Sequence, residues 1–120
     1  MFLGLRTVIY HVQDINIAKQ WYSTVLDIQP YFDQPYYVGF NIGGFELGLD
    51  PDAKKVSYGN NVVAYWFVKD IKNAHARILK QGAKKNTDIQ DVGDNILLAT
   101  VIDPFGNILG LIENPNFKNE

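Results

Sequence analysis

The chain has 120 residues, of which 47% are hydrophobic and 20% are charged, and its formal net charge is −2. This composition is typical of one globular domain, and so weak a charge argues against a nucleic-acid partner. No cysteine is present, which excludes a disulfide framework, a cysteine-ligated metal site and a thiol nucleophile. No apolar run is long enough to span a membrane, and the first residues do not resemble a signal peptide. We therefore expect a cytoplasmic protein with no membrane partner.

Two segments of the chain resemble each other. The first, "TVIYHVQDINIAKQWYSTVLD", starts at Thr7, and the second, "VVAYWFVKDIKNAHARILKQG", starts at Val62. Four residues recur at one constant offset of 56 positions: Val12, Asp14, Ile15 and Ala18 match Val68, Asp70, Ile71 and Ala74. An equal offset at four positions indicates a duplicated unit.

Each copy predicts a strand that leads into a helix. Apolar residues alternate before Asp14 and before Asp70, as in a strand with one buried face. Each aspartate can accept hydrogen bonds from the first free N–H groups of a helix. Apolar residues at helical spacing then predict helices over 14–27 and 70–82, and Gly82 is a suitable end for the second.

Three apolar runs follow each helix. We expect strands over 28–32, 36–42 and 45–49 in the first copy, and over 83–90, 95–102 and 108–112 in the second. The sequence therefore predicts an α+β fold of two βαβββ modules in a single domain, with module one at 1–50, a polar linker at 51–61 and module two at 62–120.

Two motifs connect this layout to a known family. "VQDINIAKQWYSTVLD" resembles V-x-D-x-x-x-A-x-x-F/W-Y-x-x-x-L-G, with Asp27 where glycine is usual, and "DPFGNILGLIEN" resembles D-P-x-G-N-x-x-E-L. Both patterns are typical of the vicinal oxygen chelate superfamily, which includes glyoxalase I, extradiol dioxygenases and bleomycin-resistance proteins. The resemblance covers nearly the whole chain. It implies a cupped, mixed or antiparallel sheet with the helices outside, and a homodimer.

The resemblance also implies where a metal would bind. In metal-dependent members the ligands are usually a histidine in the first strand and a glutamate in the last strand of each module. The corresponding positions here hold Thr7, Gly48, Val63 and Gly110. Divalent transition metals in proteins are held by imidazole, thiolate or carboxylate, none of which these residues supply. We therefore expect no metal and no cofactor.

Glycine at 48 and 110 has two interpretations. It either permits close packing or opens space for a ligand at the centre of the cup. The strand period places His11 on the same face as Thr7, and it is either a rim residue or a catalyst. Glu46 shares the face of Gly48, where it is either an exposed carboxylate, an anchor for a cationic or hydroxylated ligand, or a base that acts with His11.

Other residues extend the candidate site or lie outside it. Tyr65 and Phe67 share the face of Val63, and aromatic side chains of this kind commonly line small-molecule sites. His75 is expected at the edge of a helix's buried face, and Glu113 is expected in solvent, so neither is a site candidate.

The leading functional hypothesis is a metal-independent binding protein that sequesters a small, partly aromatic molecule, as the resemblance to bleomycin-resistance proteins implies. One alternative is a glyoxalase-like or dioxygenase-like enzyme with a non-standard divalent metal site. Another is an interaction module whose cup is filled by its own side chains. The expected partners are a small-molecule ligand and a second copy of the chain.

Overall fold

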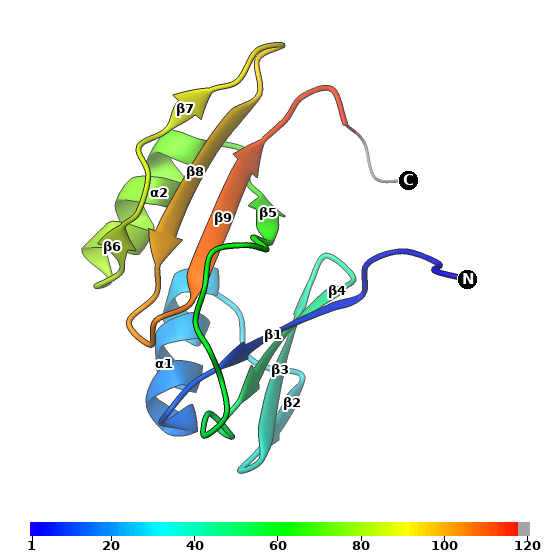
Figure 1. Cartoon of the computed structure of the whole chain (residues 1–120), viewed down its shortest axis with the longest axis vertical. Coiled ribbons are helices and arrows are strands. Elements are labelled where there is room, and N and C mark those ends of the chain that lie inside the picture. Colours follow the sequence, from blue (N-terminus) through cyan, green and yellow to red (C-terminus); the bar gives the residue numbers. More distant parts are fainter. Residues whose placement is uncertain (118–120) are drawn as a thin grey trace. The chain divides into compact units, whose positions relative to one another are not determined.

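A computed structural model describes residues 1–117 of the chain (Figure 1). The chain divides into two compact units, Met1–Ser57 and a second unit that begins at Tyr58. The division lies within the polar segment 51–61. Each unit contains one helix and one mixed sheet, so the predicted α+β class is confirmed. Within residues 1–117, neither helix has the length and apolar character needed to cross a membrane.

The first unit has the predicted order strand, helix and three strands. Its elements are β1 (Thr7–His11), α1 (Ile15–Leu26), β2 (Phe32–Gln34), β3 (Tyr37–Ile42) and β4 (Phe45–Asp50). The sheet order is β1-β4-β3-β2, in which β1 runs parallel to β4 and the other neighbours are antiparallel.

Helix α1 begins and ends as its sequence predicts. The Asp14 side chain accepts hydrogen bonds from the N–H groups of Asn16 and Ile17, and Asp27 ends the helix with a left-handed backbone (φ 56°). The helix packs against β3 and β4 and buries Tyr22, whose ring stacks on Tyr10 at 6.3 Å. This packing assigns one face of the sheet to the core.

The opposite, helix-free face of the first sheet carries the alternate residues of each strand. The buried residues of β3 and β4 lie on the helix side of the sheet: Val38, Phe40, Leu47 and Leu49. Because side chains alternate along a strand, the residues next to them point to the opposite side. The helix-free face is made of Thr7, Ile9 and His11 from β1, Glu46, Gly48 and Asp50 from β4, and Tyr37, Gly39 and Asn41 from β3.

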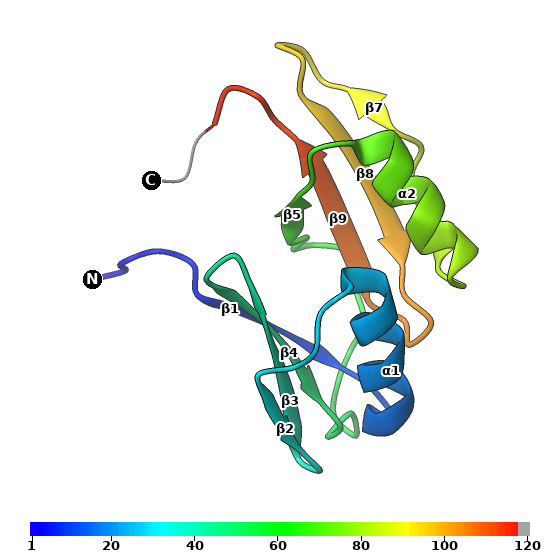
Figure 2. The ribbon, with the colours of Figure 1, turned by 180° about the vertical axis from the view of Figure 1, so that it is seen from behind.

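The second unit repeats this plan with shorter outer strands. Its elements are β5 (Tyr65–Phe67), α2 (Ile71–Lys80), β6 (Lys84–Lys85), β7 (Gln90–Asp91), β8 (Leu97–Ile102) and β9 (Ile108–Glu113). The sheet order is β5-β9-β8-β6, with β7 also paired to β8, and α2 packs against β8 and β9 (Figure 2). The registers of the two units agree, because Ile9 pairs with Gly48 and Tyr65 pairs with Gly110, each in a parallel ladder.

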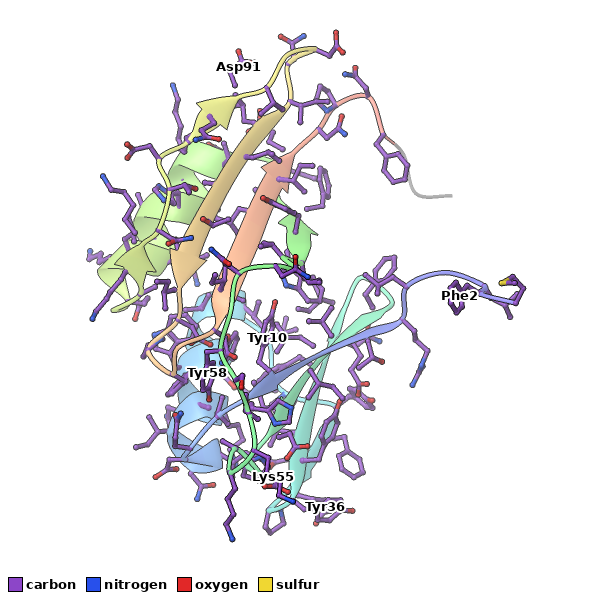
Figure 3. All side chains as sticks on the ribbon, viewed as in Figure 1. Phe2, Tyr10, Tyr36, Lys55, Tyr58 and Asp91 are labelled. Atoms are coloured by element: carbon purple, nitrogen blue, oxygen red, sulfur yellow. The ribbon has the colours of Figure 1, made fainter. Side chains whose placement is uncertain are left out.

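The strand predicted over 28–32 is shifted toward the C-terminus. Pairing with β3 begins at Tyr31, whose N–H donates to the carbonyl of Gly39 at 2.9 Å, and β2 starts at Phe32. Pro30 has no N–H to donate, so the ladder cannot extend through it. The β2–β3 hairpin then places the exposed Tyr36 at its tip (Figure 3).

The strand predicted over 83–90 is interrupted. The N–H groups of Asn86 and Thr87 both donate to the carbonyl of Thr100, at 3.1 and 3.0 Å, so two residues stand opposite one and the ladder breaks into β6 and β7. Strand β8 begins at Leu97 rather than 95, because Asp94 and Asn95 have positive φ angles of 56° and 63°.

The surroundings of Glu113 and His75 in the second unit differ in detail from those expected. Glu113 is not free in solvent, since its Oε1 accepts the N–H of Ile71 at 3.0 Å and so helps Asp70 to cap α2. His75 is only 8% exposed, on the buried side of α2, and its Nε2 has no hydrogen-bond partner.

The D-P-x-G-N motif forms a braced turn. Asp103 is 2% exposed, and its Oδ1 accepts the N–H groups of Phe105 and Asn107 at 2.9 and 2.7 Å. Its Oδ2 accepts Nδ2 of Asn107 at 3.1 Å, and Gly106 supplies the positive φ of 98° that the turn needs. The most specific motif of the sequence therefore has a structural role in joining β8 to β9.

Replacing Asp103 should destabilise the protein strongly. Asp103→Ala removes the acceptor for two backbone N–H groups, and a buried donor without a partner costs about 1–3 kcal/mol, so we expect a loss of roughly 2–4 kcal/mol in urea denaturation. The control is Asp91→Ala, which removes one hydrogen bond in an exposed turn, to the N–H of Gly93. Equal losses for the two variants would contradict a bracing role for Asp103.

Candidate functional site

Two glycines face each other at the middle of the helix-free face of the first sheet. Gly39 pairs with Gly48, and neither position is empty. A Cβ on Gly48 would lie 1.9 Å from Tyr37 Oη, and one on Gly39 would lie 2.6 Å from Glu46 Oε2 and 3.0 Å from Tyr31 Cε1. The side chain of Tyr37 therefore covers the backbone of Gly48, and those of Glu46 and Tyr31 cover the backbone of Gly39. For Gly48 this favours the close-packing interpretation over open space.

The group held against these glycines is a hydrogen-bonded cluster, the Glu46 cluster, made of Glu46, Thr7, Tyr31 and Tyr37. Thr7 Oγ1 donates to Glu46 Oε1 at 3.0 Å, and the Tyr31 hydroxyl donates to Oε2 in a short hydrogen bond. The Tyr37 hydroxyl acts on the carboxylate electrostatically, and each shifts the pKa of the other. Glu46 thus receives two hydroxyl protons, one from β1 and one from the segment before β2.

These hydrogen bonds shift the ionisation of the cluster in one consistent sense. The Tyr31 hydroxyl contributes most to holding the pKa of Glu46 below its usual value, against the opposite effect of burial. Thr7, Tyr37 and Arg6 add smaller contributions that also lower this pKa. Burial first, and then the negative charge of Glu46, raises the pKa of Tyr37 to about 12. The hydrogen bond to Glu46 also raises the pKa of Tyr31. The site therefore combines an ionised carboxylate with phenols that keep their protons.

His11 lies on the same face but outside the cluster. Its Nδ1 donates to the backbone carbonyl of Asp52 at 2.9 Å, which directs the ring toward the end of β1. Thr7 pairs with Glu46 whereas His11 pairs with Asp50, and four residues of strand span about 13 Å. A proton cannot pass directly between His11 and Glu46 over that distance, so the structure does not bring this predicted pair together.

The candidate residues of the second unit surround another covered glycine. A Cβ on Gly110 would lie 2.7 Å from both the Ala64 carbonyl oxygen and Tyr65 Cδ1. Tyr65 and Phe67 are 43% and 66% exposed on β5, and Val63 is half-buried just before that strand. This group presents apolar and aromatic surface, in contrast to the polar cluster of the first unit.

Sequence reasoning identified Thr7 and Glu46 as site residues but missed Tyr31 and Tyr37, the other two members of the cluster. Tyr37 precedes Gly39 by two residues and therefore shares its face, which is the signal that could have identified it. Tyr31 lies in the predicted strand 28–32, but no pattern in the sequence indicates the register that places its side chain beside Glu46.

The residues present do not fit the divalent metal that the superfamily resemblance implies. Gly48 has no side chain and is covered by Tyr37, and the hydroxyl of Thr7 is engaged with Glu46. Gly110 is likewise covered, by Tyr65. Within residues 1–117, no group of three or more His, Cys, Asp or Glu side chains is placed to hold a metal ion.

A shallow hollow of about 280 Å³ lies elsewhere in the first unit, between α1 and the β2–β3 hairpin. It is bordered by the Lys19–Asp33 ion pair (3.1 Å) and by Val38, which points to the helix side of the sheet. The hollow is therefore on the other side of the sheet from the Glu46 cluster.

Comparison with solved structures identifies the fold. A glyoxalase-related enzyme from Fulvimarina pelagi is 15% identical with a TM-score of 0.77, covering 99% of this chain and 94% of that one. A glyoxalase/bleomycin resistance protein from Albidiferax ferrireducens T118 is 19% identical with a TM-score of 0.75, covering 92% and 98%. A lactoylglutathione lyase from Agrobacterium tumefaciens is 13% identical with a TM-score of 0.76, covering all of both chains.

No protein-family model matches the chain, and no curated protein matches it. The solved structures show that the chain has the glyoxalase/bleomycin resistance protein/dioxygenase fold, as the resemblance to the vicinal oxygen chelate superfamily predicted. At identities below 20% they show this fold alone.

The contact between Gly48 and Tyr37 can be tested by a double-mutant cycle. Gly48→Ala forces the Tyr37 ring off the sheet, and overpacking of this kind costs roughly 1–3 kcal/mol in denaturant unfolding. In a Tyr37→Ala background the same change should cost much less, because the obstructing ring is gone. The control is Gly59→Ala, since a Cβ there meets nothing within 4 Å. The same cost for Gly48→Ala in both backgrounds would contradict the contact.

Tyr37 should ionise later than an ordinary tyrosine. Subtracting the tyrosinate absorbance of Tyr37→Phe from that of the wild type should reveal one phenol that titrates near pH 12. Because its folded pKa is raised, its contribution to stability is complete below the ordinary tyrosine pKa of 10 and is lost as the pH rises toward 12. A difference curve centred at pH 10 would show that Glu46 and burial do not act on this hydroxyl.

Proposed function

We propose that this protein binds a small, partly aromatic organic molecule without a metal ion, and that the helix-free face of the first sheet forms part of the site. The observation that carries the proposal is the Glu46 carboxylate, which the hydroxyl groups of Thr7 and Tyr31 hold on a surface that is still accessible. Tyr31 is 61% exposed and the neighbouring Ile9 is 49% exposed, so a ligand can reach the cluster.

The chemistry of this face is that of a ligand site rather than of an ordinary strand surface. Small-molecule sites typically combine apolar or aromatic side chains with a few polar groups in fixed positions. The tyrosine rings supply the first component and the braced carboxylate supplies the second. In the second unit, considered by itself, Tyr65 and Phe67 are also exposed aromatic side chains.

An enzyme of the glyoxalase or dioxygenase type is the rival proposal, and it requires a metal held in an unusual way. The lyase activity named for the Agrobacterium tumefaciens structure belongs to that protein, which is 13% identical to this chain. The residues at the four ligand positions supply no strong donor, which supports the metal-independent proposal instead.

A second alternative is an interaction module whose surface is completed by its own side chains. One observation favours it, because the tyrosine rings occupy the space above Gly48 and Gly110. The exposure of Tyr31 supports a ligand site more directly, since a side chain that only filled the surface would not remain accessible.

Metal independence predicts that divalent ions leave the folded protein unchanged. Specific binding raises stability by roughly 2.7 kcal/mol at a hundredfold excess over Kd, which would shift a thermal melt clearly. Melts of the purified protein with Ni²⁺, Zn²⁺, Fe²⁺ or Mn²⁺, and with a chelator, should therefore coincide. Near-stoichiometric metal by elemental analysis, together with a melt lowered by chelator, would overturn the proposal in favour of the enzyme.

A further inference from the structure

The hydrogen bonds of the Glu46 cluster limit what it can offer to a ligand. A hydroxyl group has one proton and two lone pairs. Thr7 and Tyr31 both donate their protons to Glu46. With their protons engaged, these two hydroxyls present lone pairs to any incoming molecule. The cluster is therefore a set of acceptors, and a ligand must bring the donors.

The net charge of the cluster is negative, so it favours a cationic ligand as the acceptor lone pairs favour a donor. Arg6 is the cation that acts on Glu46, but it is exposed and its effect on the carboxylate is smaller than that of any of the three hydroxyls. Neither of the ion pairs found among residues 1–117 involves Glu46. The negative charge of the carboxylate is therefore only weakly compensated by neighbouring cations.

The aromatic rings around the carboxylate add to this field. The face of a tyrosine ring carries the negative part of its quadrupole and attracts cations that approach it. Tyr31 and Tyr37 both contribute rings beside the carboxylate. A carboxylate or phosphate on a ligand would meet the lone pairs of Thr7 and Tyr31 and the negative charge of Glu46.

We propose that the Glu46 cluster recognises a protonated amine, so that the ligand of this site is an organic cation with N–H donors. The inference rests on the proposed function, and it adds the chemical class of the ligand. An ammonium group supplies three donors and a positive charge, which match the acceptor hydroxyls and the carboxylate. Thr7, Tyr31 and Tyr37 are positioning residues that fix the carboxylate and contribute acceptors.

The experiment compares three probes with one aromatic skeleton, 1-naphthylmethylamine, 1-naphthalenemethanol and 1-naphthoate, by NMR titration of the isotope-labelled protein at neutral pH. Shifts of the backbone amides of β1, β3 and β4 report binding at the helix-free face. We expect the amine to bind about tenfold more tightly than the carboxylate, with the alcohol between them, as an accessible charge pair with hydrogen bonds would give.

Two variants assign this preference to one charge. Glu46→Gln keeps the size of the side chain and an oxygen acceptor but removes the charge, so the preference for the amine should disappear. Asp91→Asn removes one charge from an exposed position on β7 of the second unit (Figure 3) and should leave the preference unchanged. The comparison of probes on the wild type needs no variant, so it decides the matter even if Glu46→Gln does not fold.

The possible results separate the two proposals. Preference for the amine that Glu46→Gln abolishes supports both. Equal binding of all three probes at this face, or tighter binding of the carboxylate, overturns the cation inference and leaves the ligand site standing. An amine preference that survives in folded Glu46→Gln also overturns the inference. No shift at this face with any probe at about 10 mM, a concentration that detects even very weak ligands, overturns both.

Discussion

The carboxylate of Glu46 is the group on which the helix-free face of the first sheet depends. It accepts hydroxyl protons from Thr7 in β1 and from Tyr31 in the segment before β2, so it connects parts of the chain that are far apart in sequence. A half-buried carboxylate without such donors would lose hydration without compensation. Each hydroxyl offsets part of that cost. In return the negative charge holds the tyrosine rings in place against Gly39 and Gly48.

This arrangement gives Gly48 and Gly110 a structural role that the sequence does not reveal. The resemblance to the vicinal oxygen chelate superfamily implies that Gly48 and Gly110 stand where metal-dependent members carry a metal-binding side chain. In the structure a tyrosine ring covers each of them, Tyr37 in the first unit and Tyr65 in the second. An aromatic ring packed on a strand glycine replaces contacts that the missing side chain would have made. The absence of a side chain at Gly48 and the presence of the Tyr37 ring are therefore one structural feature, and a carboxylate could not be introduced at Gly48 without displacing Tyr37.

The sequence predicted those parts of the fold that depend on local pattern. The repeat, the caps at Asp14 and Asp70 and the strands of the inner ladders follow from periodicity and from residues a few positions apart. The start of β2 was misplaced because Pro30 removes a donor from a run that is otherwise apolar. The contact of Tyr31 with Glu46 could not be predicted, since it depends on strand register and on the reach of a long side chain. Thr7 and Glu46 could be identified because strand alternation alone places them on one face.

The two units share a backbone plan but differ in chemistry on their helix-free faces. Through the common register, Thr7, Tyr37 and Glu46 of the first unit correspond to Val63, Leu98 and Ile108 of the second. These three members have apolar counterparts, whereas the fourth, Tyr31, corresponds to Asn86 and Thr87, whose N–H groups pair with Thr100 as that of Tyr31 pairs with Gly39. Gly48 corresponds to Gly110, so that glycine is kept in both units. A residue needed only for the fold would be expected in both copies, as the capping aspartates are. A hydrogen-bonded carboxylate that occurs in one copy alone is not required by the plan, and this asymmetry supports the ligand site proposed above.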